Sequence, residues 1–117
     1  MSKDIQSPGD DPEILAAFLS QVDEFVQLVQ QCTKASPHRF VLETARVAQR
    51  CRGDAEFLRL PEFSALARTL EHACVQPELP ARCLCEGAQL LQWRSRQPQA
   101  QMTGEERAFI DRWAFPT

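Results

Sequence analysis

The feature that most limits what this chain can fold into is a run of apolar residues at three- and four-residue steps near its start. This spacing puts apolar side chains on one stripe of an α-helix. Asp11 and Pro12 are typical of a helix start, with Asp11 as the N-cap and Pro12 in the first turn. The sequence therefore predicts a long helix from residue 11, with the inner stripe Ile14, Leu15, Phe18, Leu19, Val22, Phe25, Val26 and Val29.

Four further segments have the same periodicity, and each follows a start signal or a proline-rich link. Ser36-Pro37 and Pro61 open the second and third, a loop with Pro77 and Pro80 leads to the fourth, and Thr103 to Glu106 form a capping box for a short fifth. The expected inner residues of the second segment are Val41, Ala45, Ala48, Cys51, Ala55 and Leu58, and those of the third are Phe63, Leu66, Ala67, Leu70, Ala73 and Cys74. Those of the fourth segment are Leu84, Gly87, Ala88 and Leu91, and those of the fifth are Phe109, Ile110 and Trp113.

We expect an all-α protein, because no alternating strand pattern of useful length is present. Four amphipathic helices with short links bury their stripes most simply as an antiparallel up-down-up-down four-helix bundle, with the short fifth helix packed on one end. Residues 1–10 are polar and predict a flexible lead-in, and residues 11–117 predict a single domain. Small residues in the middle of the second stripe allow neighbouring helices to approach closely.

Composition excludes several classes of function. The net charge of −3 gives no general attraction to nucleic acid or to an anionic membrane. The opening MSKDIQSPGDD lacks the apolar core of a signal peptide, and no apolar run approaches membrane length, so we expect a cytoplasmic protein. The five cysteines should then remain thiols. The sequence has no glycine-rich phosphate loop, no Ser-His-Asp set and no paired carboxylates in a plausible cleft, and we expect neither enzyme activity nor a cofactor.

One stretch carries a more specific pattern. Residues 48–71 read AQRCRGDAEFLRLPEFSALARTLE. They resemble the helix pair of histidine phosphotransfer (HPt) domains, including that of chemotaxis kinases, where the pattern is Ala-His-x-x-Lys-Gly-x-Ala-x-x-Leu/Phe, a short corner, and Leu-x-x-x-Leu/Met-Glu. The matching positions are Ala48, Arg52, Gly53, Ala55, Leu58, Leu66, Leu70 and Glu71. The opening DPEILAAFLSQVDEFVQLV also resembles the first helix of chemotaxis-type members, so the likeness covers most of residues 11–97.

The resemblance implies a phosphotransfer scaffold in which Gln49 occupies the place of the phosphorylated histidine. An amide nitrogen is not a nucleophile, because its lone pair is delocalised into the carbonyl, but the amide still donates and accepts hydrogen bonds. The expected function is non-catalytic binding of a response-regulator receiver domain or a two-component or chemotaxis kinase, as adaptor or competitor. The expected partner-binding residues are Gln49, Arg46, Arg50, Arg52, Gly53 and Glu56.

Other interpretations of the same residues are open. The arginines around Gln49 are also what a solvated helix face contains. A helical interaction module unrelated to phosphorelay would instead use the fourth and fifth segments, with Trp93, Arg94, Arg96 and Trp113. A small metal or redox switch would use His72, Cys74, Cys83 and Cys85, although this spacing matches no known zinc pattern. His38 and His72, the two histidines, are expected in surface or capping roles.

Overall fold

The computed structural model describes residues 11–34, 37–78 and 80–114, and gives only the backbone for residues 32–34 and 37–41. These residues form five α-helices and no strand. The helices are α1 (Pro12–Lys34), α2 (Pro37–Phe57), α3 (Pro61–Cys74), α4 (Ala81–Arg96) and α5 (Gly104–Arg112). The all-α class and the five segments are thus confirmed. The expected lead-in, residues 1–10, lies outside the described residues.

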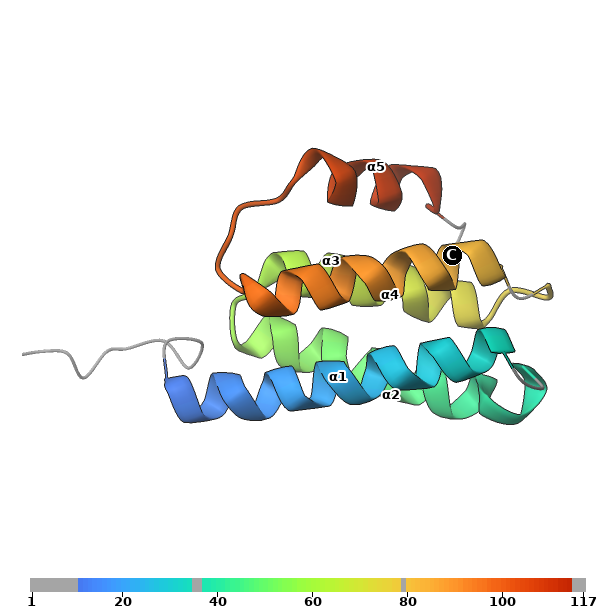
Figure 1. Ribbon diagram of the computed structural model, residues 1–117, viewed down its shortest axis with the longest axis horizontal. Coiled ribbons are helices and arrows are strands. Elements are labelled where there is room, and N and C mark those ends of the chain that lie inside the picture. Colours follow the sequence, from blue (N-terminus) through green and yellow to red (C-terminus); the bar gives the residue numbers. More distant parts are fainter. Residues whose placement is uncertain (1–10, 35–36, 79, 115–117) are drawn as a thin grey trace, which may run out of the picture.

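The first four helices lie side by side around a common core (Figure 1). α1 contacts α2, α2 contacts α3, α3 contacts α4, and α1 also contacts α4, which closes the ring. Figure 1 shows the chain reversing direction from each of these helices to the next. α5 lies alongside α3 and α4 and contacts both, rather than packing on one end of the bundle as expected. The chain is therefore a helical bundle with one added short helix.

The helix starts follow the sequence signals. The Asp11 carboxylate accepts hydrogen bonds from the backbone N–H groups of Glu13 at 2.9 Å and Ile14 at 3.4 Å, as an N-cap should. At α5, Thr103 Oγ1 accepts from the Glu106 N–H at 3.1 Å, and the Glu106 carboxylate accepts from the Thr103 N–H at 2.9 Å. The predicted N-cap and capping box are both present.

The core agrees with the predicted stripes except at the ends. All the expected inner residues of α3 and α4 are buried, and Ala48, Cys51, Ala55 and Leu58 of α2 are buried too. Ile14 is 42% exposed, so its assignment to the inner stripe of α1 is wrong. Leu15 and Leu19 are half-buried, and the other residues of that stripe are buried. Ala45 is half-buried, and the side chain of Val41 lies outside what the structure describes.

A close approach between α3 and α4 explains one glycine. A Cβ placed on Gly87 would lie 2.5 Å from Leu70 Cδ2, and Leu70 is fully buried. Atoms at that separation overlap, and a packed core can give way only at a cost. Gly87 therefore sets how closely the two helices pack.

The corner between α2 and α3 has a strained backbone. Arg59 has φ 60°, the left-handed region that favours glycine. The Leu60 N–H donates to the Ala55 carbonyl at 2.8 Å across this corner, as in a glycine-type helix C-cap. A positive φ at arginine costs about 1–2 kcal/mol relative to the right-handed region. The corner turns α2 into α3 while leaving the Arg59 side chain exposed.

A fully buried ion pair fastens α5 to α4. Arg94 donates to Glu106 from Nε at 2.5 Å and from Nη2 at 2.7 Å. It also donates to the carbonyls of Ala100 at 2.7 Å and Gln101 at 3.1 Å in the intervening loop. Both charged side chains are 0% exposed. Arg94, assigned above to an alternative binding surface, is thus a core residue, and that expectation is wrong for this residue.

No helix in the described part of the chain has the length and apolar character needed to cross a membrane. Among the cysteines whose side chains are described, Cys51, Cys74 and Cys83 are buried and Cys85 is exposed.

Candidate functional site

Gln49 lies on the outer side of α2. Ala48, one residue before it, and Cys51, two residues after it, face the core and are at most 2% exposed, whereas Gln49 is exposed. Arg46 and Gly53, three residues before and four after, share its side of the helix because of the helical repeat, and both are exposed. We call the surface formed by Arg46, Gln49, Arg50 and Gly53 the Gln49 face.

The Gln49 face is sterically open. A Cβ placed on Gly53 would meet nothing within 4 Å. Its φ is not positive, so the helix does not require glycine there for conformational reasons. The absence of a side chain at Gly53 leaves the surface beside the Gln49 amide low and accessible to a partner's loops.

Arg52 is turned toward α3 rather than toward solvent. Its Nε donates to Glu71 Oε1 at 2.7 Å, and its Nη1 lies 3.6 Å from Glu56 Oε2. The hydrogen bond to Glu71 raises the pKa of Arg52 above its ordinary value, although partial burial acts in the opposite direction. The Arg52 side chain is 24% exposed, so its charge lies at the edge of the Gln49 face and is held in a fixed position.

Arg46 and Arg50 supply exposed positive charge. Both are exposed, and neither joins an ion pair with another described residue. Glu56, expected on the same surface, is drawn toward α3, where its Oε2 accepts from the Ser64 hydroxyl at 3.3 Å and lies 3.7 Å from Arg68 Nη2. The Gln49 face is therefore cationic in a chain whose net charge is −3.

Asp54 follows Gly53 in sequence but faces the other neighbouring helix. Its carboxylate accepts from Gln21 Nε2 of α1 at 3.0 Å. The same Nε2 lies 3.7 Å from Cys51 Sγ. Burial raises the pKa of the Cys51 thiol to about 11, and the hydrogen bond from Gln21 only partly offsets this. Asp54 and Cys51 thus join α2 to α1 instead of contributing to the Gln49 face.

Two exposed apolar side chains extend the Gln49 face, and the sequence analysis missed them. Leu42 is 76% exposed and Phe57 is 69% exposed. They lie seven residues before and eight residues after Gln49, close to the same stripe of α2. Phe57 also borders a groove of about 240 Å³ between α1 and α2, beside Ile14 and Asp54. Counting helical turns from Gln49, instead of only along the buried stripe of α2, would have identified these two residues.

Glu71 was also missed as a site residue, although it closes the HPt-like pattern. It is the residue that fixes Arg52, 19 positions away along the chain. This pairing depends on how α2 and α3 pack, and helical spacing within one element does not reveal it.

The alternative sites have different geometries. No group of three or more His, Cys, Asp or Glu side chains converges as a metal site among the described residues. Cys83 is buried and Cys85 is exposed, so the two sulfur atoms lie on different sides of α4. Burial raises the pKa of Cys83 to about 12, which keeps it protonated. The side chain of His38 lies outside what the structure describes.

Comparisons with family models, curated proteins and solved structures returned no match for this chain.

Proposed function

We propose that this chain is a non-catalytic HPt-like signalling protein, whose first four helices adopt the up-down-up-down arrangement of that family. The observation that carries the proposal is the exposed Gln49 amide, on an open cationic helix face, at the place where the HPt pattern has its phosphorylated histidine. A buried Gln49 would have removed the basis for it. Two features support this arrangement: the contacts that join α1, α2, α3 and α4 in a closed ring, and the reversal of chain direction from each of these helices to the next.

Gln49 accounts for binding without catalysis. Its amide occupies the space of an imidazole and forms hydrogen bonds of similar reach, but it has neither a nucleophilic nitrogen nor a proton that titrates near neutral pH. A partner can therefore dock while no phosphoryl group is transferred.

The proposed partner is a receiver domain, or a kinase of the two-component or chemotaxis class, that presents an acidic rim. Arg46 and Arg50 are exposed and not neutralised by described neighbours, so they are available to an acidic surface. Such rim charges accelerate association and favour partners of opposite charge. Leu42 and Phe57 provide apolar contact on either side. By covering a receiver's phosphorylation face, the protein would compete with true phosphotransfer domains.

Binding to receiver domains is the first test, measured by isothermal titration calorimetry with matched variants. Arg50→Glu should weaken binding about tenfold, and the loss should shrink at high salt. Arg96→Glu is the control, because Arg96 is also exposed but lies on α4. If Arg96→Glu weakens binding and Arg50→Glu does not, the α4–α5 surface is the true interface and the proposal is wrong.

Gly53→Leu gives an independent test of the same face. A side chain there points into open space, so the variant should fold normally, yet it should obstruct a partner that approaches Gln49. Arg52→Glu is a poorer choice, because it breaks the contact with Glu71 and disturbs the packing of α2 on α3. Unchanged affinity of the folded Gly53→Leu variant would contradict docking at this face.

Loss of catalysis is tested by phosphoryl transfer. Incubation with a receiver charged with radioactive phosphate should leave this protein unlabelled. Stable labelling of the wild-type chain would show that it is a working phosphotransfer protein.

A further inference from the structure

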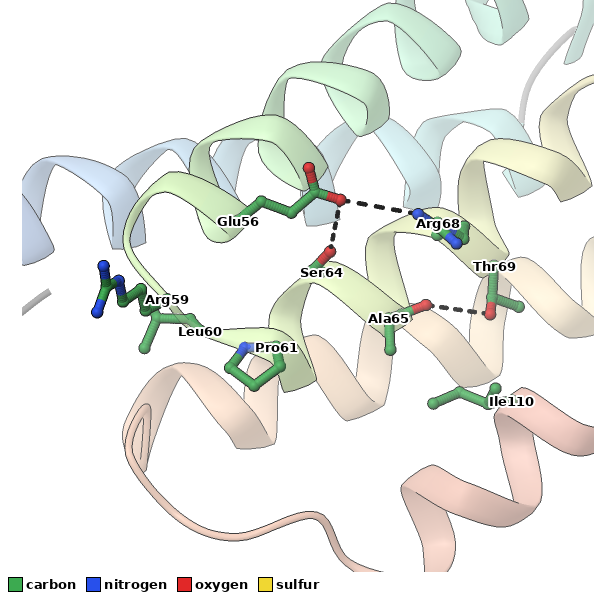
Figure 2. A pocket seen from close by; sticks show the side chains of 9 residues that line it. All are labelled: Glu56, Arg59, Leu60, Pro61, Ser64, Ala65, Arg68, Thr69 and Ile110. Atoms are coloured by element: carbon green, nitrogen blue, oxygen red, sulfur yellow. Dashed lines mark hydrogen bonds and ion pairs between the residues drawn. The ribbon is translucent and has the colours of Figure 1, made fainter.

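A second groove lies at the α2–α3 corner. It has a volume of about 640 Å³ and lies between the beginning of α3 and Ile110 of α5. Figure 2 shows Leu60, Pro61, Ala65 and Ile110 along it, with Arg59 at one end and Glu56, Ser64 and Arg68 on one wall. Its volume is within the usual range for small-ligand sites, about 300–1,000 Å³.

The hydrogen-bonding groups of this groove are already partly used. Ser64 Oγ donates to Glu56 at 3.3 Å, and Thr69 Oγ1 donates to the Ala65 carbonyl at 3.1 Å (Figure 2). Each hydroxyl has one proton, so neither can donate to a ligand without breaking its present bond. A sugar or a nucleoside, which needs several donors and acceptors, would be poorly matched by these walls. The exposed walls are mainly apolar.

The remaining polar groups of the groove are charged. Arg59 and Arg68 are both exposed, and Arg68 forms a loose ion pair of 3.7 Å with Glu56, whose side chain is 48% exposed. Arg107 is also exposed and lies one turn before Ile110 on α5. Two arginines against one glutamate in the lining leave a net charge of +1, which suits a single negative charge better than a dianion.

The backbone conformation at Arg59 is a further sign that the groove is a ligand site. Glycine is the residue that adopts φ 60° without cost, but an arginine stands there, and its guanidinium is at the end of the groove. Strained positions of this kind are enriched at ligand sites.

We propose that this groove binds a small amphipathic carboxylate, with its apolar body against Pro61, Ala65 and Ile110 and its carboxylate on Arg68. The ligand then replaces Glu56 as the partner of Arg68. Because Glu56 also lies 3.6 Å from Arg52, its release from Arg68 leaves it to Arg52 at the edge of the Gln49 face.

Decanoate is a suitable probe, titrated into the isotope-labelled full chain and followed by NMR of the backbone amides. Saturable shifts at Ala65, Thr69 and Ile110 are expected. Decanol, with the same apolar body and no charge, should bind about tenfold more weakly, because a charge-assisted contact is lost. Equal binding of decanol, or shifts confined to the Gln49 face, would overturn the proposal.

Two variants should change decanoate binding in opposite directions, and a third is the control. Arg68→Gln should weaken decanoate binding about tenfold, whereas Glu56→Gln should strengthen it about threefold, because the competing carboxylate is removed. Arg82→Gln on α4 is the control, since the Arg82 side chain is 78% exposed and lies away from the groove. If Glu56→Gln weakens binding, or if Arg82→Gln matters as much as Arg68→Gln, the carboxylate is not held by Arg68. These binding measurements do not involve a receiver domain, so their result is independent of the proposed signalling function.

Discussion

Replacing Glu106 with glutamine tests what holds α5 on the bundle. The substitution keeps the size of the side chain and a carbonyl oxygen, but it removes the negative charge that faces Arg94. Arg94 is 0% exposed and donates four hydrogen bonds of 2.5 to 3.1 Å, two of them to Glu106. The variant leaves a buried guanidinium with only neutral acceptors.

Removing one partner of a buried ion pair costs about 3–5 kcal/mol, because the remaining charge stays desolvated. Little of this comes from the helix cap, since glutamine also serves in a capping box with Thr103. For a chain of this size, a loss of 1 kcal/mol lowers the melting temperature by about 4 °C, so we expect a decrease of about 12–20 °C.

Urea unfolding followed by far-UV circular dichroism measures the loss. Glu105→Gln is the matched control, because Glu105 is the exposed neighbour in the same first turn, and it should change stability by less than about 0.5 kcal/mol. Replacing both Arg94 and Glu106 with leucine should recover much of the loss, since no charge is then left buried. A loss below about 1 kcal/mol for Glu106→Gln would refute the view that this pair is desolvated.

The same pair predicts a dependence on pH. Burial acts to raise the pKa of Glu106, but hydrogen bonds from Arg94 and Thr103 outweigh it and hold the pKa below its ordinary 4.5. A carboxyl group with a lowered folded-state pKa stabilises the fold above its unfolded-state pKa, and this stabilisation is lost as the pH falls through the folded-state value. Stability should therefore fall below about pH 4.5 in the wild type and less steeply in Glu106→Gln.

Three further predictions use urea unfolding or thiol labelling. Gly53→Ala should stabilise the protein by up to about 1 kcal/mol, because a Cβ there meets open space in a helix. Gly87→Ala should destabilise the protein by about 1 kcal/mol, because its Cβ would overlap a buried leucine. Equal effects of the two substitutions on the free energy of unfolding would contradict the packing described. Arg59→Gly should gain about 1 kcal/mol by relieving the positive φ, and a loss would show that this backbone is not strained. Iodoacetamide should label the exposed Cys85 long before Cys51, because burial raises the pKa of the Cys51 thiol to about 11. Peptide mass spectrometry locates the label, and rapid labelling of Cys51 in the native state would refute its burial.

Local signals predicted the helices well. Apolar periodicity, proline positions and capping residues act within one or two turns of chain, and they located the five helices and most of the core. The wheel of α2 likewise predicted that Gln49 is exposed while Ala48 is buried.

Contacts between helices were not predictable in the same way. The Arg52–Glu71 bond and the Arg94–Glu106 pair join residues 19 and 12 positions apart, and their geometry depends on packing angles that no single helix encodes. Arg94 illustrates the consequence: a charged residue near a helix end was assigned to the surface, but the α4–α5 loop folds over it and supplies backbone acceptors.

The most direct test of the central claim is an amide NMR map of the labelled chain during titration with a receiver domain that binds it. We predict that the largest shifts fall on α2 from Leu42 to Phe57, and that neither Gln49 nor any other residue becomes phosphorylated when the receiver is charged. Shifts centred on α4 and α5, or a phosphorylated form of this chain, would contradict it.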